Sequence, residues 1–469
     1  MKSHNYLYPL TFVVALALGC KVSKDISKPA DATPAAYRGV TNADTISIAS
    51  VPVKDFIAEP EIRNLIDTAL ARNYDLQLAV KNIESSELLF NQSKLGNIPS
   101  LNLQVTASSN RPSDNSLNGL SASQFLKTKH IEDYNASAGL SWEADIWGKI
   151  RGQKQAALAT YLQTAEVKKA VQTRLIANVA QGYYQLMMMD AQLEIAKKNL
   201  ALNDSTLLII HMQFDAGQVT SLAIQQAEAQ QLVAAQLIPQ LEQNITIQEN
   251  ALKILTGNLP GPVARSSNLE KTSVPDHLTA GLPSAMVSRR PDVRSAELSL
   301  DIANARVGIT KASMYPSLSI TASGGLNSFK ASNWFNVPAS LFGVVSGGIT
   351  QPVFQRKQLK TQYELAKIDR EKVVIAFRQS VLNAVGEVSD ELVKIEKLKS
   401  QYDISLKRVT TLHQAVKNAN LLFKNGMATY LEVITAQSNS LQSELELAAI
   451  KTARLSASVA LYRSLGGGI

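Results

Sequence analysis

The amino-acid sequence of this chain contains an internal repeat, which limits the folds that it can adopt. The phrases FDAGQVTSL at 214–222 and FKNGMATYL at 423–431 share a Phe, a Gly three residues later and a Leu five residues after that. They lie 209 residues apart (423 − 214). Farther toward the N-terminus, NYDLQLA at 73–79 aligns with RPDVRSA at 290–296 at an offset of 217. One large unit is therefore duplicated, with a period far above the roughly 20–50 residues of solenoid and propeller repeats.

Each half contains two segments that alternate between apolar and small polar residues. We expect strands at about 100–109 and 134–146 in the first half, and at 316–326 and 341–353 in the second. The offset changes by 217 − 209 = 8 residues between the strands of a pair, where a loop is expected. Segments of this length and pattern are typical of membrane β-strands around a wet lumen. A half-buried strand of a soluble sheet has the same alternation, so the pattern leaves both interpretations open.

Long helical stretches follow each strand pair. The residues at 148–213 and 357–422 contain no proline and are rich in Ala, Leu, Gln, Lys and Glu. A helix of about 65 residues would be roughly 100 Å long. Further helical runs at 220–255 and 429–464 predict that each long helix turns back as an antiparallel hairpin.

The repeated phrases fall at the two reversals of direction. Gly217 and Gly426 suit the left-handed position that ends a helix. Thr220 and Thr429 suit the N-cap of the returning helix. A further helix is expected at 55–97, ended by Pro99.

Four membrane strands cannot form a barrel on their own, because single-chain barrels need at least about eight. Lipid also leaves no partner for an open sheet edge. Several copies must therefore join their strands, and the long hairpins would continue the barrel as a helical tube. The pattern itself does not give the number of copies. The fold class expected is mainly α with a membrane β-barrel portion, built from a duplicated unit of strand pair plus long helical hairpin.

The N-terminal segment indicates export. Lys2 precedes the apolar stretch YLYPLTFVVALALGC, which is typical of a secretory signal peptide. Its end, LALGC, resembles the lipobox of bacterial lipoproteins and makes Cys20, the single cysteine, the candidate lipidation site. The predicted organisation is a signal peptide (1–19), a lipidated tether with little structure of its own (20–53), a first repeat (54–257), a linker (258–287) and a second repeat (288–469).

Three stretches resemble a known family. They are SRRPDVRSAELSLDIANARVGITKASMYPSLSITASGG at 288–325, LSWEADIWGKIRG at 140–152 and the terminal LYRSLGGGI. They are similar to the TolC-type outer-membrane factors, in the lipoprotein branch that serves RND efflux pumps. The resemblance implies a homotrimer in which a 12-stranded β-barrel continues as a 12-helix α-barrel. It also implies a lipid-anchored outer-membrane location reaching into the periplasm, with a periplasmic adaptor and an inner-membrane RND-type pump as partners.

The resemblance also assigns roles to residues near the two reversals. It makes Gly217, Gln218, Val219, Gly426, Met427 and Ala428 the tips that contact the adaptor. Leu431 takes the position of the family's hydrophobic gate, and Glu432 that of an acid found in some members. Thr435 stands where many members have a second acid, and Ser438 where a basic residue is frequent. A salt-bridge lock is therefore not expected in this gate.

Catalytic, cofactor and metal sites have little support in the sequence. The histidines are scattered, and the MMM run at 187–189 points around a helix, which favours packing over metal binding. The net charge of +8 comes without a basic patch interleaved with aromatics, so nucleic acid is not an expected partner. Three functions remain: the exit duct of an efflux pump for drugs or metal ions, a duct for type I protein secretion, and a non-conducting periplasmic coiled-coil scaffold. The resemblance favours the first, and the transported substrate cannot be deduced from the sequence.

Overall fold

A computed structural model describes residues 34, 36–38, 47–265, 268–274 and 278–468. The chain forms two compact units, which are described separately. The strand unit comprises Glu84–Leu162 and Glu297–Ile375, and the hairpin unit comprises the described parts of Ala30–Ile83, Gln163–Ala296 and Ala376–Ile469. The compact units therefore differ from the two sequence repeats, because each unit draws on both halves of the chain.

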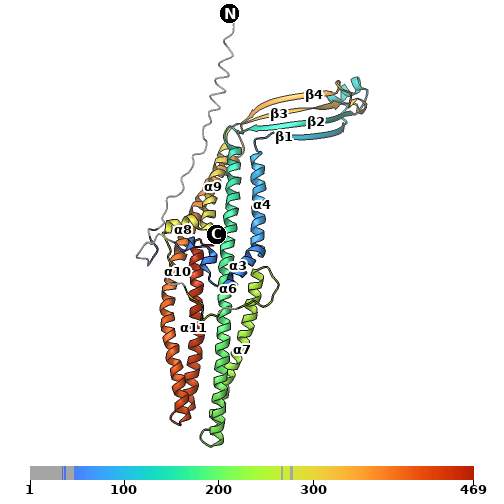
Figure 1. Cartoon of the computed structure of the whole chain (residues 1–469). Helices are drawn as coiled ribbons and strands as arrows, with labels where there is room; N and C mark the ends of the chain where they lie inside the picture. The colour runs from blue at the N-terminus through green and yellow to red at the C-terminus, as the bar shows by residue number, and fades with distance from the viewer. Residues whose placement is uncertain (1–33, 35, 39–46, 266–267, 275–277, 469) are drawn as a thin grey trace. The chain divides into compact units, whose positions relative to one another are not determined.

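The strand unit contains one antiparallel sheet of four strands in the order β1-β2-β3-β4 (Figure 1). The strands are β1 (Ser100–Asn110), β2 (Ile131–Ala144), β3 (Ser317–Ser328) and β4 (Leu341–Thr350). All four predicted strands are present, with shifts at their ends. β2 stops before Asp145, because that side chain accepts the backbone N–H groups of Ile150 and Arg151 and so begins the next helix. β4 ends two residues before Pro352, which has no N–H to donate.

Residues that lie opposite one another in the sheet share a face, and these pairs match in polarity. Leu101, on the same face as Leu103, pairs with Leu140 on β2, and Leu140 pairs with Ala322 on β3. Ala322 in turn pairs with Val345 on β4, so one apolar row crosses all three strand pairings. The other face carries small polar groups such as those of Ser137. One face of the sheet is thus apolar, and the other carries small polar groups on β1 to β3, with Phe342 and Val344 added by β4.

The hairpin unit is built from four long helices. They are α6 (Lys149–Asp215), α7 (Ser221–Leu255), α10 (Gln358–Lys424) and α11 (Tyr430–Ser464). α6 and α10 each run without a break for 67 residues and enter both units. The two predicted helical hairpins are confirmed, and α7 stays helical through Pro239.

The helix expected at 55–97 is wrong in detail, because the chain divides there into α2 (Val53–Phe56), α3 (Pro60–Arg72) and α4 (Tyr74–Lys94). The α3–α4 break has a local cause. The Asn73 side-chain oxygen accepts the N–H of Leu76, as an N-cap does, while its amide donates to the carbonyl of Leu255. The remaining elements are η1 (Ile48–Ser50), α5 (Leu117–Ser121), η2 (Ala122–Leu126), α8 (Pro283–Arg289), α9 (Pro291–Ala312) and η3 (Ala331–Asn333).

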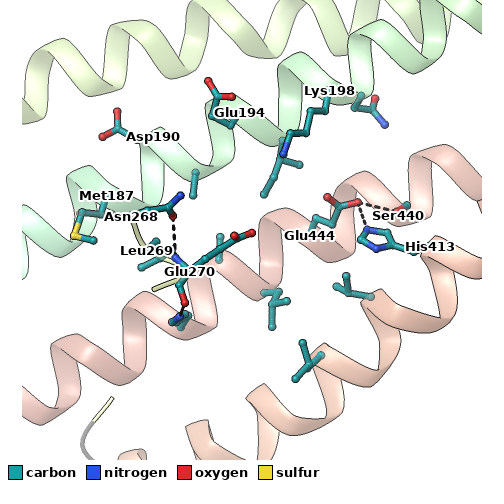
Figure 2. Close-up of a pocket in the computed structure, with 18 of the residues that line it drawn as sticks. Met187, Asp190, Glu194, Lys198, Asn268, Leu269, Glu270, His413, Ser440 and Glu444 are labelled. Carbon is teal, nitrogen blue, oxygen red and sulfur yellow. Dashed lines mark hydrogen bonds and ion pairs between the residues drawn. The ribbon is translucent and has the colours of Figure 1, made fainter. Parts of the chain in front are cut away.

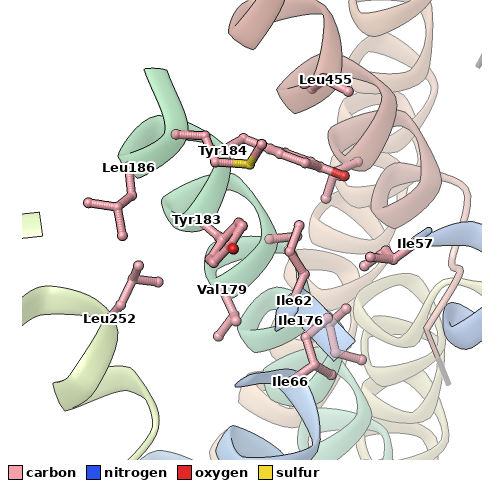
Figure 3. Packing of buried hydrophobic residues seen from close by; sticks show 14 of the residues in the cluster. Ile57, Ile62, Ile66, Ile176, Val179, Tyr183, Tyr184, Leu186, Leu252 and Leu455 are labelled. Carbon is pink, nitrogen blue, oxygen red and sulfur yellow. The ribbon is translucent and has the colours of Figure 1, made fainter. Parts of the chain in front are cut away.

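The main hydrophobic core of the hairpin unit surrounds the middle of α6 (Figure 3). Tyr183 and Leu186 of α6 pack there with Ile62 of α3, Leu252 of α7 and Leu455 of α11. Met187 is buried in the same cluster, as expected if the methionine run serves packing.

A second cluster in this unit includes Tyr37 and Ile48. The predicted tether is therefore partly ordered, because its apolar side chains bury themselves against the hairpin unit. Within the described ranges, no helix has the length and hydropathy needed to cross a membrane.

Candidate functional site: the hairpin tips

Both helical reversals have the backbone that the sequence predicts. Gly217 and Gly426 adopt φ values of 71° and 69°. At the first tip the N–H of Gln218 donates to the carbonyl of Gln213 at 2.8 Å. At the second tip the N–H of Met427 donates to the carbonyl of Leu422 at the same distance. These bonds close α6 and α10 with the same left-handed glycine motif.

The returning helices begin differently. Thr429 precedes α11, and its N–H donates to the Glu432 carboxylate at 2.7 Å, as in a capping box. Thr220 precedes α7 in a similar extended conformation, but no side-chain bond caps that helix. Thr220 therefore occupies the predicted N-cap position, but its side chain makes no capping bond. The residue at the position equivalent to Glu432 is Ala223, which cannot supply the reciprocal bond.

A hydrophobic cluster joins the two hairpins near their tips, and we call it the tip cluster. Its buried members come from all four long helices: Ile210, Ala223, Ala227, Phe423 and Val433. Beside this cluster, the Tyr430 hydroxyl donates to the side-chain carbonyl of Gln226 at 2.6 Å. The tips of α7 and α11 are thus linked by both apolar packing and a hydrogen bond.

The two hairpins do not contact each other through equivalent faces. Phe423 is 4% exposed in the tip cluster, whereas its repeat equivalent Phe214 is 41% exposed. Ala223 is fully buried, whereas its equivalent Glu432 is exposed. The contact is therefore heterologous, and each hairpin keeps a second face uncovered. Contacts of this kind generate rings when they are repeated with closure.

The predicted tip residues fall into two groups. Gly217, Gln218, Gly426 and Met427 are exposed. Val219 and Ala428 are half-buried because they pack against the tip cluster. The three predicted gate residues, Leu431, Glu432 and Thr435, are exposed on the first turns of α11. Cys20 lies outside the described residues.

A second arrangement of polar groups lies at the other end of the α10–α11 hairpin. The guanidinium of Arg290, at the start of α9, donates to Asp292 and to Glu387 of α10, both at 2.7 Å. It also donates to the carbonyl of Ser464 in α11 at 2.8 Å. Arg463 of α11 forms an ion pair with the same Glu387. We call these residues the root cluster, because they tie α9, α10 and α11 together.

The electrostatics of the root cluster favour the charged forms. Burial pushes the pKa of Asp292 upward, but hydrogen bonding and charge from Arg290 outweigh it and hold that pKa below its usual value. Such a shift marks a pair that stabilises the folded state above the pKa of the unfolded carboxyl.

A cavity of about 850 Å³ lies within the hairpin unit between α6, α10 and α11 (Figure 2). Acidic and basic side chains line it, including Glu194, Lys198 and Glu270. His413 contacts Glu444 at 2.9 Å, linking α10 to α11 at its edge. Among the described residues, no group of three or more His, Cys, Asp or Glu side chains has the geometry to hold a metal ion. The lining of the cavity therefore carries both positive and negative side chains.

Three of these features were not predicted from the sequence. The Tyr430–Gln226 bond and the Arg290–Glu387 pair join residues 204 and 97 positions apart. The capping box had a visible signal, since Thr429 and Glu432 have the T-x-x-E spacing. The other two have no local signature, because they depend on which helices lie side by side.

The residues on both sides of these reversals match a known family. The match is to the outer membrane efflux proteins, and it covers residues 65–258 and 282–467. The chain belongs to this family. The two matched segments correspond to the two halves found by internal alignment, and the resemblance to TolC-type factors is confirmed.

Individual relatives extend over nearly the whole chain. The cation efflux system protein CusC of Escherichia coli is 28% identical, covering 98% of each chain. The solvent efflux pump outer membrane protein SrpC of Pseudomonas putida is 29% identical, covering 97% of each. The open-state structure of the MtrE outer membrane channel of Neisseria gonorrhoeae superposes with a TM-score of 0.84 at 25% identity, covering 96% of this chain and 98% of that one. This protein is thus an outer-membrane exit duct for efflux.

Proposed function

We propose that three copies of this chain form the duct of a tripartite system that carries small molecules from a periplasmic adaptor and an inner-membrane RND-type pump to the exterior. The observation that carries the proposal is the open four-stranded sheet. Among the residues that the structure describes, β1 and β4 each pair on one side only. In a lipid layer every unpaired backbone group costs several kcal/mol. Pairing of β1 in one copy with β4 in the next removes both edges.

The two faces of the sheet and of the hairpins support the same assembly. The apolar face, with Leu103 and Val345 largely exposed, suits contact with lipid. The small polar face suits a water-filled lumen. The uncovered face of each hairpin, represented by Phe214 on α6, would meet the next copy in a ring.

We infer that the cargo is chosen upstream of the duct. The names of the relatives cover different cargo, from cations to solvents, on chains of closely similar length. A passive conduit needs little substrate recognition of its own. The exposed tip residues Gly217, Gln218, Gly426 and Met427 would dock the adaptor, with Val219 and Ala428 supporting them from the tip cluster.

The proposed constriction is a ring formed by Leu431 of each copy, with Thr435 one turn farther along α11. Leu431 is 55% exposed in the single chain, so its side chain is available to meet its symmetry mates. A narrow apolar ring blocks ions by excluding water. Replacing Leu431 with Ala should therefore raise single-channel conductance in planar bilayers containing the purified protein.

The chain offers a matched control for this substitution. Leu222 is the repeat equivalent of Leu431 and has almost the same exposure, 54%. We expect Leu222→Ala to leave the conductance near that of the parent. Equal conductance of all three proteins would contradict the proposed constriction. A parent protein that neither assembles as a trimer nor conducts ions would contradict the proposed duct.

We also propose that Cys20 carries the lipid anchor. A single acyl chain holds a protein on a membrane only marginally, whereas several chains give a stable anchor. Because Cys20 would be the acylated residue, Cys20→Ser should abolish incorporation of labelled palmitate, as measured on the protein isolated from labelled cells. Palmitate still attached to the Cys20→Ser protein would refute this site, because the chain has no other cysteine.

A further inference from the structure

The first turn of α11 is held at three points around the proposed constriction. The Glu432 carboxylate accepts the N–H of Thr429 at 2.7 Å, which fixes the turn that precedes the helix. The hydroxyl of Tyr430 donates to Gln226 of α7 at 2.6 Å. Val433 is fully buried in the tip cluster. Leu431 lies between these anchored residues and is itself exposed, so its direction is set by its neighbours.

The first hairpin lacks the acid, for a structural reason. Ala223 takes the position of Glu432 there, and it is fully buried against the other hairpin. A longer side chain at that position would have to displace the tip cluster. At the second hairpin the same position is exposed, so a carboxylate fits and can reach back to Thr429. Only the start of α11 is therefore fastened in this way.

We propose that Glu432 is a positioning residue, which holds Leu431 in the constriction by capping α11, rather than a charge that faces the ion path. This inference rests on the proposed constriction at Leu431. A carboxylate that accepts a backbone N–H at a helix N-terminus forms a strong, charge-assisted bond. It also interacts favourably with the helix dipole. A carboxylate engaged in this bond is turned back toward Thr429 rather than extended toward permeating ions.

Two substitutions separate the capping role from a charge role. Glu432→Gln removes the charge but keeps an oxygen that can accept the Thr429 N–H, since glutamine also serves in capping boxes. Glu432→Ala removes both the charge and the acceptor. If Glu432 acts through the cap bond, the Glu432→Gln protein should have the helix stability and conductance of the parent, and the Glu432→Ala protein should differ in both. A ring of charges in the path predicts that both variants lose cation preference alike.

The test uses the full-length protein, purified as assembled. Hydrogen exchange of the backbone amides at 425–433 reports on the cap, and planar bilayers report conductance and cation preference. We expect Glu432→Ala to exchange about fivefold faster at these amides, as loss of a helix cap implies. Its conductance should rise, while its cation preference stays that of the parent. Glu432→Gln should match the parent in all three measurements.

Asp215→Asn is the matched control for loss of an exposed acid near a tip, because Asp215 ends α6 in the other hairpin. It should change none of the three measurements. Equal loss of cation preference in the Gln and Ala variants would overturn the inference. Parent-like exchange in Glu432→Ala would also overturn it. Failure of the duct itself would appear differently, as a parent that does not conduct, and the exchange rates would still decide whether Glu432 caps α11.

Discussion

Gly426→Trp should abolish efflux while leaving assembly and membrane insertion intact. Gly426 is at the second tip, and a Cβ added there would meet no atom within 4 Å. The indole would therefore project from the tip into the space where we place the adaptor. Membrane fractionation and native electrophoresis would measure insertion and assembly. Resistance of the host strain to metal cations and to organic solvents would measure efflux.

Gly426→Ala separates the effect of bulk from that of backbone strain. At a φ of 69°, any residue with a Cβ is strained by about 1–2 kcal/mol. The Ala variant carries this strain with almost no added volume, so we expect it to keep most of the resistance. Parent-level resistance of Gly426→Trp would contradict docking at this tip. Equal loss in both variants would assign the effect to the backbone of the turn instead.

Arg290→Met should cause a large loss of stability, seen as a lower midpoint in thermal unfolding of the purified protein. The Arg290 side chain is only 8% exposed and donates hydrogen bonds to two carboxylates and one carbonyl. Removing one partner of a buried ion pair costs about 3–5 kcal/mol. We expect the free energy of unfolding to fall by about 3 kcal/mol, the lower end of this range. The side chains of Glu387 and Asp292 are 29% and 49% exposed, so water partly screens their charges.

Acid should reduce the difference between the parent and Arg290→Met. The pKa of Asp292 is lowered in the folded protein, so its contribution is present above the unfolded value of about 3.9. It is lost as the pH falls through the lowered folded pKa. Arg306→Met removes an exposed arginine from α9, the helix that directly follows Arg290, and should leave the midpoint nearly unchanged. A variant at Arg290 as stable as the one at Arg306 would contradict the structural role of the root cluster.

The sequence predicted the elements of this fold because their patterns are local or repeated. Alternation around Leu103 and Leu140 located strands, and the glycines at 217 and 426 located the reversals. These patterns predict strands and helices because each kind of element repeats its side-chain directions with a fixed period, independently of the neighbouring elements. The family resemblance extended this to a function, and the family match over both halves confirms it.

The break at Asn73 shows where local patterns fail. Pro60 marks the start of α3, but residues 61–95 have helical composition, and no proline or glycine indicates that the chain turns at Asn73. The turn depends on Leu255, whose carbonyl accepts from the Asn73 side chain across 182 positions of sequence. Asn73 therefore acts as a helix cap because its side chain is held by a hydrogen bond to Leu255 of α7.

The duplicated unit, the strand pairs, the hairpins and the family could thus all be predicted from the order of the residues. The different surroundings of equivalent residues became visible in the packed fold. Phe423 is buried while Phe214 is exposed, and Glu432 caps a helix whereas Ala223 is buried in the tip cluster. The reason is that one hairpin packs on the other through a heterologous contact, which places equivalent positions in different surroundings. A repeated sequence gives both halves the same backbone conformation. The surroundings of each side chain depend on which element packs against it.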